Sequence, residues 1–310
     1  MIVRWSLAEL PEVLAEAGIE RPFVIASPRW KILDLPHVEW WAEVPSHRFE
    51  VPDVADGILA VGGGSAIDTG KYASARSGKP VVHVPTTYSG AEWTTFYGIR
   101  SPDRVMQGGG AGALPVAIVY DVDLTLELPP DVTAGTAMNG LAHCAEALYV
   151  KGHNDEADAQ ALEGARLIAT SLPRVVDAPH DREARMELLR GACHAGAALG
   201  GSGLALAHAM AQAVGGRYGL PHGTLNGICL PPALSWNAQW APEAVERFTA
   251  IVPDVERLAA LGGPTRLREL DVPREDLPDL AEAAAGRAGN QANPRPATPA
   301  EIEELLESVF

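Results

Sequence analysis

The chain has 310 residues, of which 47% are hydrophobic and 21% are charged, and its formal net charge at pH 7 is −16. This composition excludes wholesale disorder, and the length is sufficient for two domains. The negative charge argues against a nucleic acid or an anionic membrane as the main partner, because either would repel the chain at long range.

The N-terminal segment MIVRWSLAELPEVLAEAG is amphipathic and does not have the pattern of a signal peptide. No stretch reaches the roughly 18 apolar residues that a membrane-spanning helix needs. We therefore expect a cytoplasmic protein with no membrane partner. Its cysteines, Cys144, Cys193 and Cys229, lie far apart within apolar runs. This placement predicts buried free thiols.

Four short apolar runs dominate the first part of the chain, and they are RPFVIAS (21–27), GILAVGG (57–63), KPVVHVPTT (79–87) and LPVAIVYD (114–121). Continuous apolar content is typical of parallel strands that are covered on both faces. Between the second and third runs, SAIDTGKYASARS has the length and pattern of a crossover helix. The sequence therefore predicts a Rossmann-like α/β domain with a parallel sheet over residues 1–129.

The pattern changes after this region. From residue 136 to about residue 213 the chain is rich in Ala, Leu, Glu and Arg, with apolar residues three and four apart, which predicts helix almost throughout. The Pro129-Pro130 pair marks the boundary, with Asp131 as the expected N-cap of the first helix. A loop rich in Gly, Asn and Pro and then a capped acidic helix end the chain. We expect an all-helical domain over residues 130–310.

Gly62, Gly63, Gly64 and Ser65 stand where the second apolar run passes into the predicted helix. Residues without side chains let backbone N–H groups approach a phosphate, and a helix N-terminus adds about half a positive charge. The local sequence is equally compatible with a simple tight turn.

The next run ends in Thr86 and Thr87, whose hydroxyls we expect at the same carboxyl edge of the sheet, where open parallel sheets bind ligands. Capping of a turn is the alternative role for these threonines. The first run ends in ASPRW, which offers no carboxylate to an adenosine ribose. Arg29 could instead meet a 2′-phosphate or be a surface arginine, so the choice between NAD(H) and NADP(H) stays open.

Asn139 and His143 are four residues apart in a helical segment, so their side chains should share one face, with Cβ atoms about 6 Å apart. This is the spacing of metal ligands, although an amide brings no negative charge to a cation. His208 and His222 flank a glycine-bearing turn further along the chain. Each histidine alone could be an ordinary core residue, but together the three imidazoles could converge on one site.

These segments carry a family resemblance. GGGSAIDTGK, PTTYSGAE, VYDVDLTLELPP, NGLAHCAEALY and LPHG occur in the order found in the iron-containing alcohol dehydrogenase superfamily, which the sequence resembles and which also includes dehydroquinate synthase and glycerol dehydrogenase relatives. The Asn-x-x-x-His form, Tyr88 after the threonine pair, and NPRPATPAEIEELL resemble the maleylacetate reductase branch.

The resemblance implies a dinucleotide-binding domain, a helical domain, an active site in the cleft between them, and a homodimer. Cofactor contacts are expected from the glycine loop and its neighbours, which are Arg29, Gly62, Gly63, Gly64, Ser65, Asp68, Thr86, Thr87, Tyr88 and Thr94.

The resemblance also implies the positions of a divalent metal, Fe or Zn, in the metal-dependent members. Its ligands would be Asn139, His143, His208 and His222, with Asp usual at the first of these positions and another histidine usual where this chain has Gln212. Loss of the only anionic ligand should weaken metal binding. We expect Asn139 and Gln212 to bind a polar substrate, with one of the three histidines as the acid or the oxyanion partner.

The expected function is reduction of a small oxo acid by NAD(P)H, as in maleylacetate reductases. The carboxylates of such a substrate need cations, for which Arg100, Arg104, Lys151 and Arg217 are candidates. Three alternatives stay open: a metal-dependent alcohol dehydrogenase, a lyase similar to dehydroquinate synthase, and a nucleotide-binding protein without catalytic activity.

Overall fold

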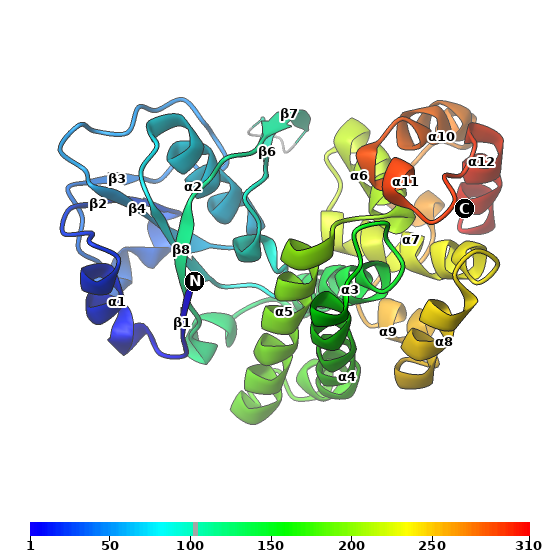
Figure 1. Cartoon of the computed structure of the whole chain (residues 1–310), viewed down its shortest axis with the longest axis horizontal. Coiled ribbons are helices and arrows are strands. Elements are labelled where there is room, and N and C mark those ends of the chain that lie inside the picture. The colour runs from blue at the N-terminus through cyan, green and yellow to red at the C-terminus, as the bar shows by residue number, and fades with distance from the viewer. Residues whose placement is uncertain (102–104) are drawn as a thin grey trace. The chain divides into compact units, whose positions relative to one another are not determined.

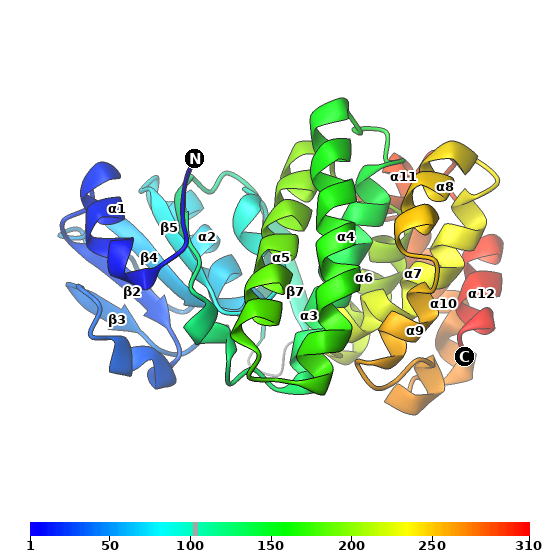
Figure 2. The same cartoon turned by 90° about the horizontal axis from the view of Figure 1, so that it is seen from below.

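The computed structural model describes residues 1–101 and 105–310 and contains two compact units (Figures 1 and 2). The sheet unit comprises residues 1–87 and 91–127, and the helical unit comprises residues 88–90 and 128–310. A parallel-sheet α/β part followed by an all-helical part confirms the predicted fold class. Among the helices in the described part of the chain, none combines the length and the apolar content that crossing a membrane requires.

The sheet unit is built on six parallel strands. In spatial order they are β1 (Ile2–Arg4), β8 (Pro115–Val119), β5 (Val81–Pro85), β4 (Gly57–Gly62), β2 (Pro22–Ala26) and β3 (Glu39–Trp41). The four predicted runs are confirmed as β2, β4, β5 and β8. The edge strands β1 and β3 were not predicted, nor was a separate antiparallel pair formed by β6 (Tyr97–Arg100) and β7 (Met106–Gly110).

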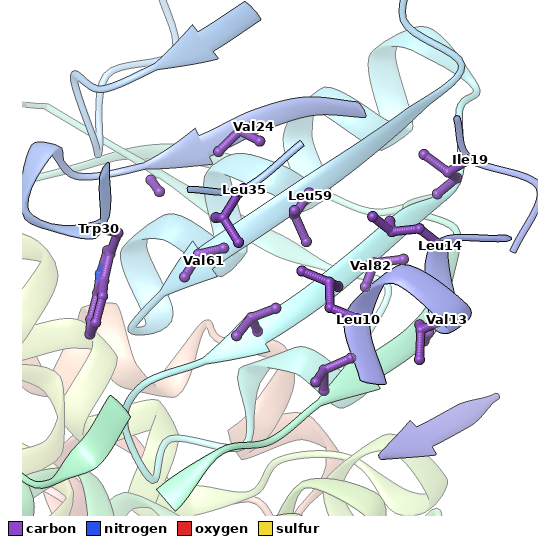
Figure 3. Close-up of a cluster of buried hydrophobic side chains, with 14 residues drawn as sticks. Leu10, Val13, Leu14, Ile19, Val24, Trp30, Leu35, Leu59, Val61 and Val82 are labelled. Carbon is purple, nitrogen blue, oxygen red and sulfur yellow. The ribbon is translucent and has the colours of Figure 1, made fainter. Parts of the chain in front are cut away.

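Both faces of the sheet are covered, which explains the continuous apolar runs. Val24, Leu59 and Val61 point to the face that α1 (Leu10–Glu16) covers (Figure 3). The alternate residues point to the opposite face, where α2 (Gly64–Ser77) packs. This crossover helix was predicted. It lies very close to β4, because a Cβ at Gly70 would stand 2.5 Å from the Cβ of Ala60.

The sheet unit contains a buried polar cluster that sequence reasoning did not identify. The hydroxyl of Tyr120 donates to Oε1 of Glu92 at 2.7 Å, while Oε2 of this carboxyl has no hydrogen-bond partner. Burial raises the pKa of Glu92. His83 is also fully buried, and burial together with the nearby positive charge of Lys71 lowers its pKa to about 3. The histidine is therefore neutral in the folded protein.

The helical unit consists of α3 (Pro130–Ala147), α4 (Asp155–Asp177), α5 (Arg182–Ser202), α6 (Leu206–Tyr218), α7 (His222–Asn237), α8 (Pro242–Ile251), α9 (Val255–Ala260), α10 (Leu277–Ala285), α11 (Ala288–Ala292) and α12 (Pro299–Ser308). The prediction of Asp131 as the N-cap of α3 is wrong. Pro129 holds that position, and Pro130 occupies the first helical residue, where its missing N–H costs nothing. The capped C-terminal helix is confirmed, since Thr298 and Glu301 form a capping box at α12.

Small residues bring α3, α4 and α5 into close contact. A Cβ at Gly164 of α4 would stand 2.9 Å from Sγ of Cys144 on α3 and 3.0 Å from the backbone nitrogen of Ala195 on α5. This close packing holds α3 rigidly, and α3 carries Asn139 and His143. All three cysteines are free, as predicted. Cys144 and Cys229 are buried, but the prediction of burial is wrong for Cys193, which is partly exposed.

Candidate active site

Three imidazoles meet in the helical unit. The rings of His143 on α3 and His208 on α6 are stacked, with centroids 4.7 Å apart, and the ring of His222 lies 5.6 Å from that of His208. A left-handed Gly219, with a φ of 68°, ends α6 and lets α7 begin three residues later. The turn reverses the chain direction and places His222, the first residue of α7, near His208.

Two asparagine amides connect the imidazoles. Asn139 on α3 donates from Nδ2 to the backbone oxygen of Ser89 at 2.8 Å, and Asn226 on α7 donates from Nδ2 to the backbone oxygen of His222 at 3.2 Å. Because a carbonyl oxygen only accepts, these contacts fix which end of each amide is nitrogen. The oxygen of Asn139 then accepts a hydrogen bond from Nδ2 of Asn226 at 2.7 Å.

Each imidazole directs its Nε2 atom at one of these amides. Nε2 of His143 lies 3.4 Å from Nδ2 of Asn139, and Nε2 of His222 lies 3.1 Å from Nδ2 of Asn226. Nε2 of His208 lies 3.3 Å from the oxygen of Asn139. The amide pair thus occupies the point on which the three rings converge.

Glu146 lies on α3, three residues beyond His143, and is fully buried. Its carboxylate accepts hydrogen bonds from Nδ1 of His208 at 2.7 Å, from the backbone nitrogen of Ala205 at 2.7 Å and from that of His208 at 3.1 Å. Both ring nitrogens of His208 therefore face acceptor oxygens, those of Glu146 and of Asn139. The carboxylate of Glu146, which lies against Nδ1, fixes the orientation of this ring.

His143 is buried against the ring of His208. Burial lowers its pKa well below the ordinary value, and the positive charges of His208 and His222 lower it further, so the ring is neutral. Since its Nε2 faces an N–H donor of Asn139, the hydrogen of the neutral ring resides on Nδ1. That nitrogen is buried without a hydrogen-bond partner. It is a donor available to a bound oxygen atom.

The donor set does not fit a divalent metal. The atoms expected to be ligands, which are the oxygen of Asn139 and Nε2 of the three histidines, contact one another through amide groups, and the one carboxylate of the cluster, Glu146, engages Nδ1 of His208 instead. Within residues 1–101 and 105–310, no three or more His, Cys, Asp or Glu side chains are arranged to hold a metal ion. A cation here would lack an anionic ligand and would have to displace an amide that is already hydrogen-bonded.

Gln212 lies one helical turn after His208 and is half-buried. No hydrogen bond is found between its side chain and the histidine cluster in the described part of the chain. Its backbone oxygen accepts from Nη2 of Arg287 at 3.0 Å, and Nε of this arginine is buried without a partner. Burial lowers the pKa of Arg287. A half-buried guanidinium therefore lies beside α6, with no ion pair to a carboxylate of the described residues.

The glycine turn of the sheet unit has the form of a cradle. Gly62 ends β4 with a φ of 148°, which other residues rarely adopt, and Gly63 precedes α2 without any side chain capping the helix. The backbone nitrogen of Thr86 donates to the oxygen of Gly62 at 3.0 Å. A Cβ at Gly63 would lie 2.9 Å from the methyl carbon of Thr87. The free N–H groups of Gly64 and Ser65 follow in the first turn of α2, where an anion is stabilised.

Asp68 and Thr94, which the sequence predicts as cofactor contacts, engage Lys71 of α2. Its buried ammonium lies 2.8 Å from a carboxylate oxygen of Asp68 and donates to the hydroxyl of Thr94 at 2.9 Å. Asp68 also accepts from the backbone nitrogen of Gly98 at 3.2 Å. In this structure both side chains connect α2 to the following loop.

Tyr88 belongs to the helical unit and is fully buried. Its hydroxyl accepts from Nη1 of Arg185 at 3.1 Å, and its backbone nitrogen donates to the hydroxyl of Thr136 at 3.3 Å. Arg185 is itself completely buried, and its remaining partners are the neutral oxygens of Pro179, Leu128 and Thr133. Sequence reasoning did not identify this arginine.

Two of the expected substrate cations have other partners. Arg217 is exposed and paired with Asp276 and Asp279, and Nζ of Lys151 donates to the backbone oxygen of Gln291 at 2.8 Å. Arg100 ends β6 in the sheet unit. Arg104 lies outside the described residues.

Comparisons with known proteins identify the family. A family model described as the Fe-containing alcohol dehydrogenase family, C-terminal, matches residues 133–310, and one described as iron-containing alcohol dehydrogenase matches residues 50–122. Maleylacetate reductase 1 of Rhodococcus opacus is 35% identical over 263 residues, which cover 83% of this chain and 73% of that protein. Maleylacetate reductase of Burkholderia cepacia is 36% identical over 263 residues, with 83% and 74% covered.

The similarity extends to three dimensions. The crystal structure of maleylacetate reductase from Rhizobium sp. strain MTP-10005 matches 100% of this chain and 95% of its own, with a TM-score of 0.88 and 29% sequence identity. The predicted resemblance is thereby confirmed for the fold and for the branch of the family. The chain belongs to the iron-containing alcohol dehydrogenase family, and within it the chain is an oxidoreductase similar to the maleylacetate reductases.

Proposed function

We propose that this protein uses NADH or NADPH to reduce an unsaturated oxo dicarboxylic acid of the maleylacetate type, and that it does so without a tightly bound divalent metal. The proposal rests on the amide pair of Asn139 and Asn226, which stands where the three imidazoles converge. The similarity to maleylacetate reductases supports the substrate class.

The sheet unit would hold the cofactor at the glycine turn. The glycines let the turn pack closely against Ala66 and Thr87, and the uncapped N-terminus of α2 offers backbone donors to a diphosphate. A bound reduced nicotinamide supplies a hydride to the alkene carbon that is conjugated to the substrate ketone.

The helical unit would supply the donors for the charge that this transfer creates. Negative charge develops on the ketone oxygen as an enolate, and an N–H donor in a water-excluded site stabilises such a charge strongly. Nδ1 of His143 is the unpartnered donor of the cluster. His208, whose Nδ1 is held by Glu146, would be the proton source within the same cluster.

Arg287 would bind a substrate carboxylate. Its half-buried guanidinium contacts α6 one turn after His208 and has an unused Nε donor. A planar fork of N–H donors is the geometry that carboxylates prefer. Arg287 was not among the cations named from the sequence, and one of those, Arg217, is already paired with two aspartates.

The test is a set of reductions followed by the absorbance of NADH and of NADPH. We expect turnover of maleylacetate or a close unsaturated oxo diacid, and much slower turnover of simple ketones and aldehydes. Protein purified without chelator should contain far less than one metal ion per chain, and treatment with EDTA should leave the activity unchanged. Stoichiometric Fe or Zn that restores activity after EDTA would instead identify a metal-dependent alcohol dehydrogenase.

A further inference from the structure

Two buried polar atoms flank the glycine turn without any hydrogen-bond partner. They are Nε1 of Trp30 and Oγ1 of Thr86. Buried donors are nearly always satisfied, because an unpaired one forfeits its hydrogen bond to water without compensation. Unpaired donors that gather at one turn therefore point to a ligand that pairs with them.

Trp30 lies in the short 3₁₀ segment Pro28–Leu33 that follows β2, the neighbour of β4 in the sheet. Only 9% of its surface is exposed. Figure 3 shows the ring beyond Val61, at the end of the sheet where β4 passes into α2. Its Nε1 lies 3.9 Å from the point that a Cβ of Gly62 would occupy. The N–H group thus lies beside the cradle.

One face of the indole is already covered. The guanidinium of Arg29 covers a face of the ring, at 4.5 Å from its centroid. The indole N–H groups of the two tryptophans of β3 are both hydrogen-bonded. Trp40 donates to the backbone oxygen of Ala26 at 2.8 Å, and Trp41 donates to that of Ser46 at 3.0 Å. The unpaired state of Trp30 is therefore not a general property of indoles in the sheet unit.

We infer that the indole N–H of Trp30 binds an oxygen atom in the adenosine diphosphate half of the cofactor. This inference rests on the proposed dinucleotide site. The end of the strand next to the glycine strand is where folds of this type place the adenosine ribose, and Trp30 follows β2 at that position. Thr86 lies across the turn, after β5, with its backbone bonded to Gly62. The two donors approach the cradle from neighbouring strands on either side of β4.

The experiment compares the wild type with three variants by titration with NADH, NADPH and ADP. In the first, Trp30→Phe removes the donor and keeps an aromatic ring. In the second, 3-benzothienylalanine at position 30 keeps the size of the indole and replaces the N–H by sulfur, so packing is retained. The third is a matched control, Trp236→Phe, because Trp236 on α7 also has a buried Nε1 without a partner but lies in the helical unit.

Both variants at position 30 should raise the Kd for NADH and for ADP by about tenfold, the effect of losing a hydrogen bond to a charged or strongly polar acceptor. The benzothienylalanine variant should unfold at the same temperature as the wild type when no cofactor is present, because the N–H of Trp30 that it lacks makes no bond within the protein. The Trp236 control should bind both ligands as the wild type does.

An unchanged Kd in the benzothienylalanine variant, with tight binding by the wild type, would overturn the inference and leave the proposed function standing. A raised Kd for NADH with an unchanged Kd for ADP would also overturn the inference, because the donor would then bind the nicotinamide half of the cofactor. If the wild type binds neither NADH nor NADPH, the proposed function fails as well.

Discussion

Replacement of Glu146 by Gln tests the proposal that a buried carboxylate organises the histidine cluster. Oε2 of Glu146 accepts from Nδ1 of His208 and from the backbone of Ala205, and Oε1 accepts from the backbone of His208. Glutamine has one acceptor oxygen, so at least one of these three bonds is lost and an N–H group then faces another N–H donor. The negative charge beside His208 is lost in either orientation.

The magnitude follows from the number and kind of these contacts. A hydrogen bond to a charged group contributes about 1.5–3 kcal/mol, and a buried donor left without its acceptor costs about 1–3 kcal/mol. We expect the free energy of unfolding to fall by about 3 kcal/mol. We also expect kcat to fall about 100-fold, because the ring of His208 loses the acceptor that fixes its orientation.

Urea denaturation followed by circular dichroism and steady-state kinetics with saturating NADH measure the two effects. Glu163→Gln is the matched control, because Glu163 on α4 is exposed and pairs with Arg166 on the protein surface. That change should alter stability by less than about 1 kcal/mol. If Glu146→Gln unfolds at the same urea concentration as the control and retains kcat, the carboxylate does not organise the cluster.

Four further changes give distinct outcomes. Asn139→Asp supplies the missing anionic ligand, so Zn²⁺ should bind at least about tenfold more tightly than to the wild type in calorimetric titration, and no gain would contradict our account of the donor set. Glu92→Gln should stabilise the protein at pH 8 and have little effect near pH 4.5. The pKa of Glu92 in the folded protein is raised from the ordinary 4.5, so the native state keeps the proton that the unfolded state releases. The wild type therefore loses stability as the pH rises above 4.5. Thermal unfolding at both pH values measures this difference, and a difference that grows toward acid pH would refute it. Gly63→Val should weaken NADH binding more than about tenfold, since an added side chain crowds the threonine beside the turn and the approach of a phosphate, and an unchanged Kd would exclude this turn as the phosphate site. Arg287→Met should raise KM for the diacid about tenfold with KM for NADH unchanged, whereas Arg217→Met should alter neither, and equal effects of the two changes would remove Arg287 from the substrate site.

The fold was predictable where a segment carries its own pattern. The central strands β2, β4, β5 and β8 are buried on both faces. Each of them therefore appears in the sequence as a continuous apolar run. The outer strands IVR and EWW have three residues each, too few for any period to be recognised. The β6–β7 pair contains a run of glycines, whose sequence carries no alternation of apolar and polar side chains.

The candidate site shows the same division. The sequence predicted that the three histidines could converge, because their spacing relative to helices and turns is local information. Asn226 had an equally local signal that sequence reasoning did not use, since it follows His222 by four residues as His143 follows Asn139. Glu146 could have been noticed as the one acidic residue of NGLAHCAEALY. No local signal could show that its partner would be His208, because that contact depends on how α3 and α6 pack.

The short segment 88–90 has a consequence for any attempt to divide this protein. The chain passes between the two units three times, after residues 87, 90 and 127, so they are joined by three covalent connections rather than one. A fragment that began at residue 128 would lack the carbonyl of Ser89 that receives the amide of Asn139, and the phenol of Tyr88 that receives Arg185. In the helical part on its own, the interior guanidinium of Arg185 and the interior amide of Asn139 would each lose one acceptor, which residues 88–90 supply in the whole chain.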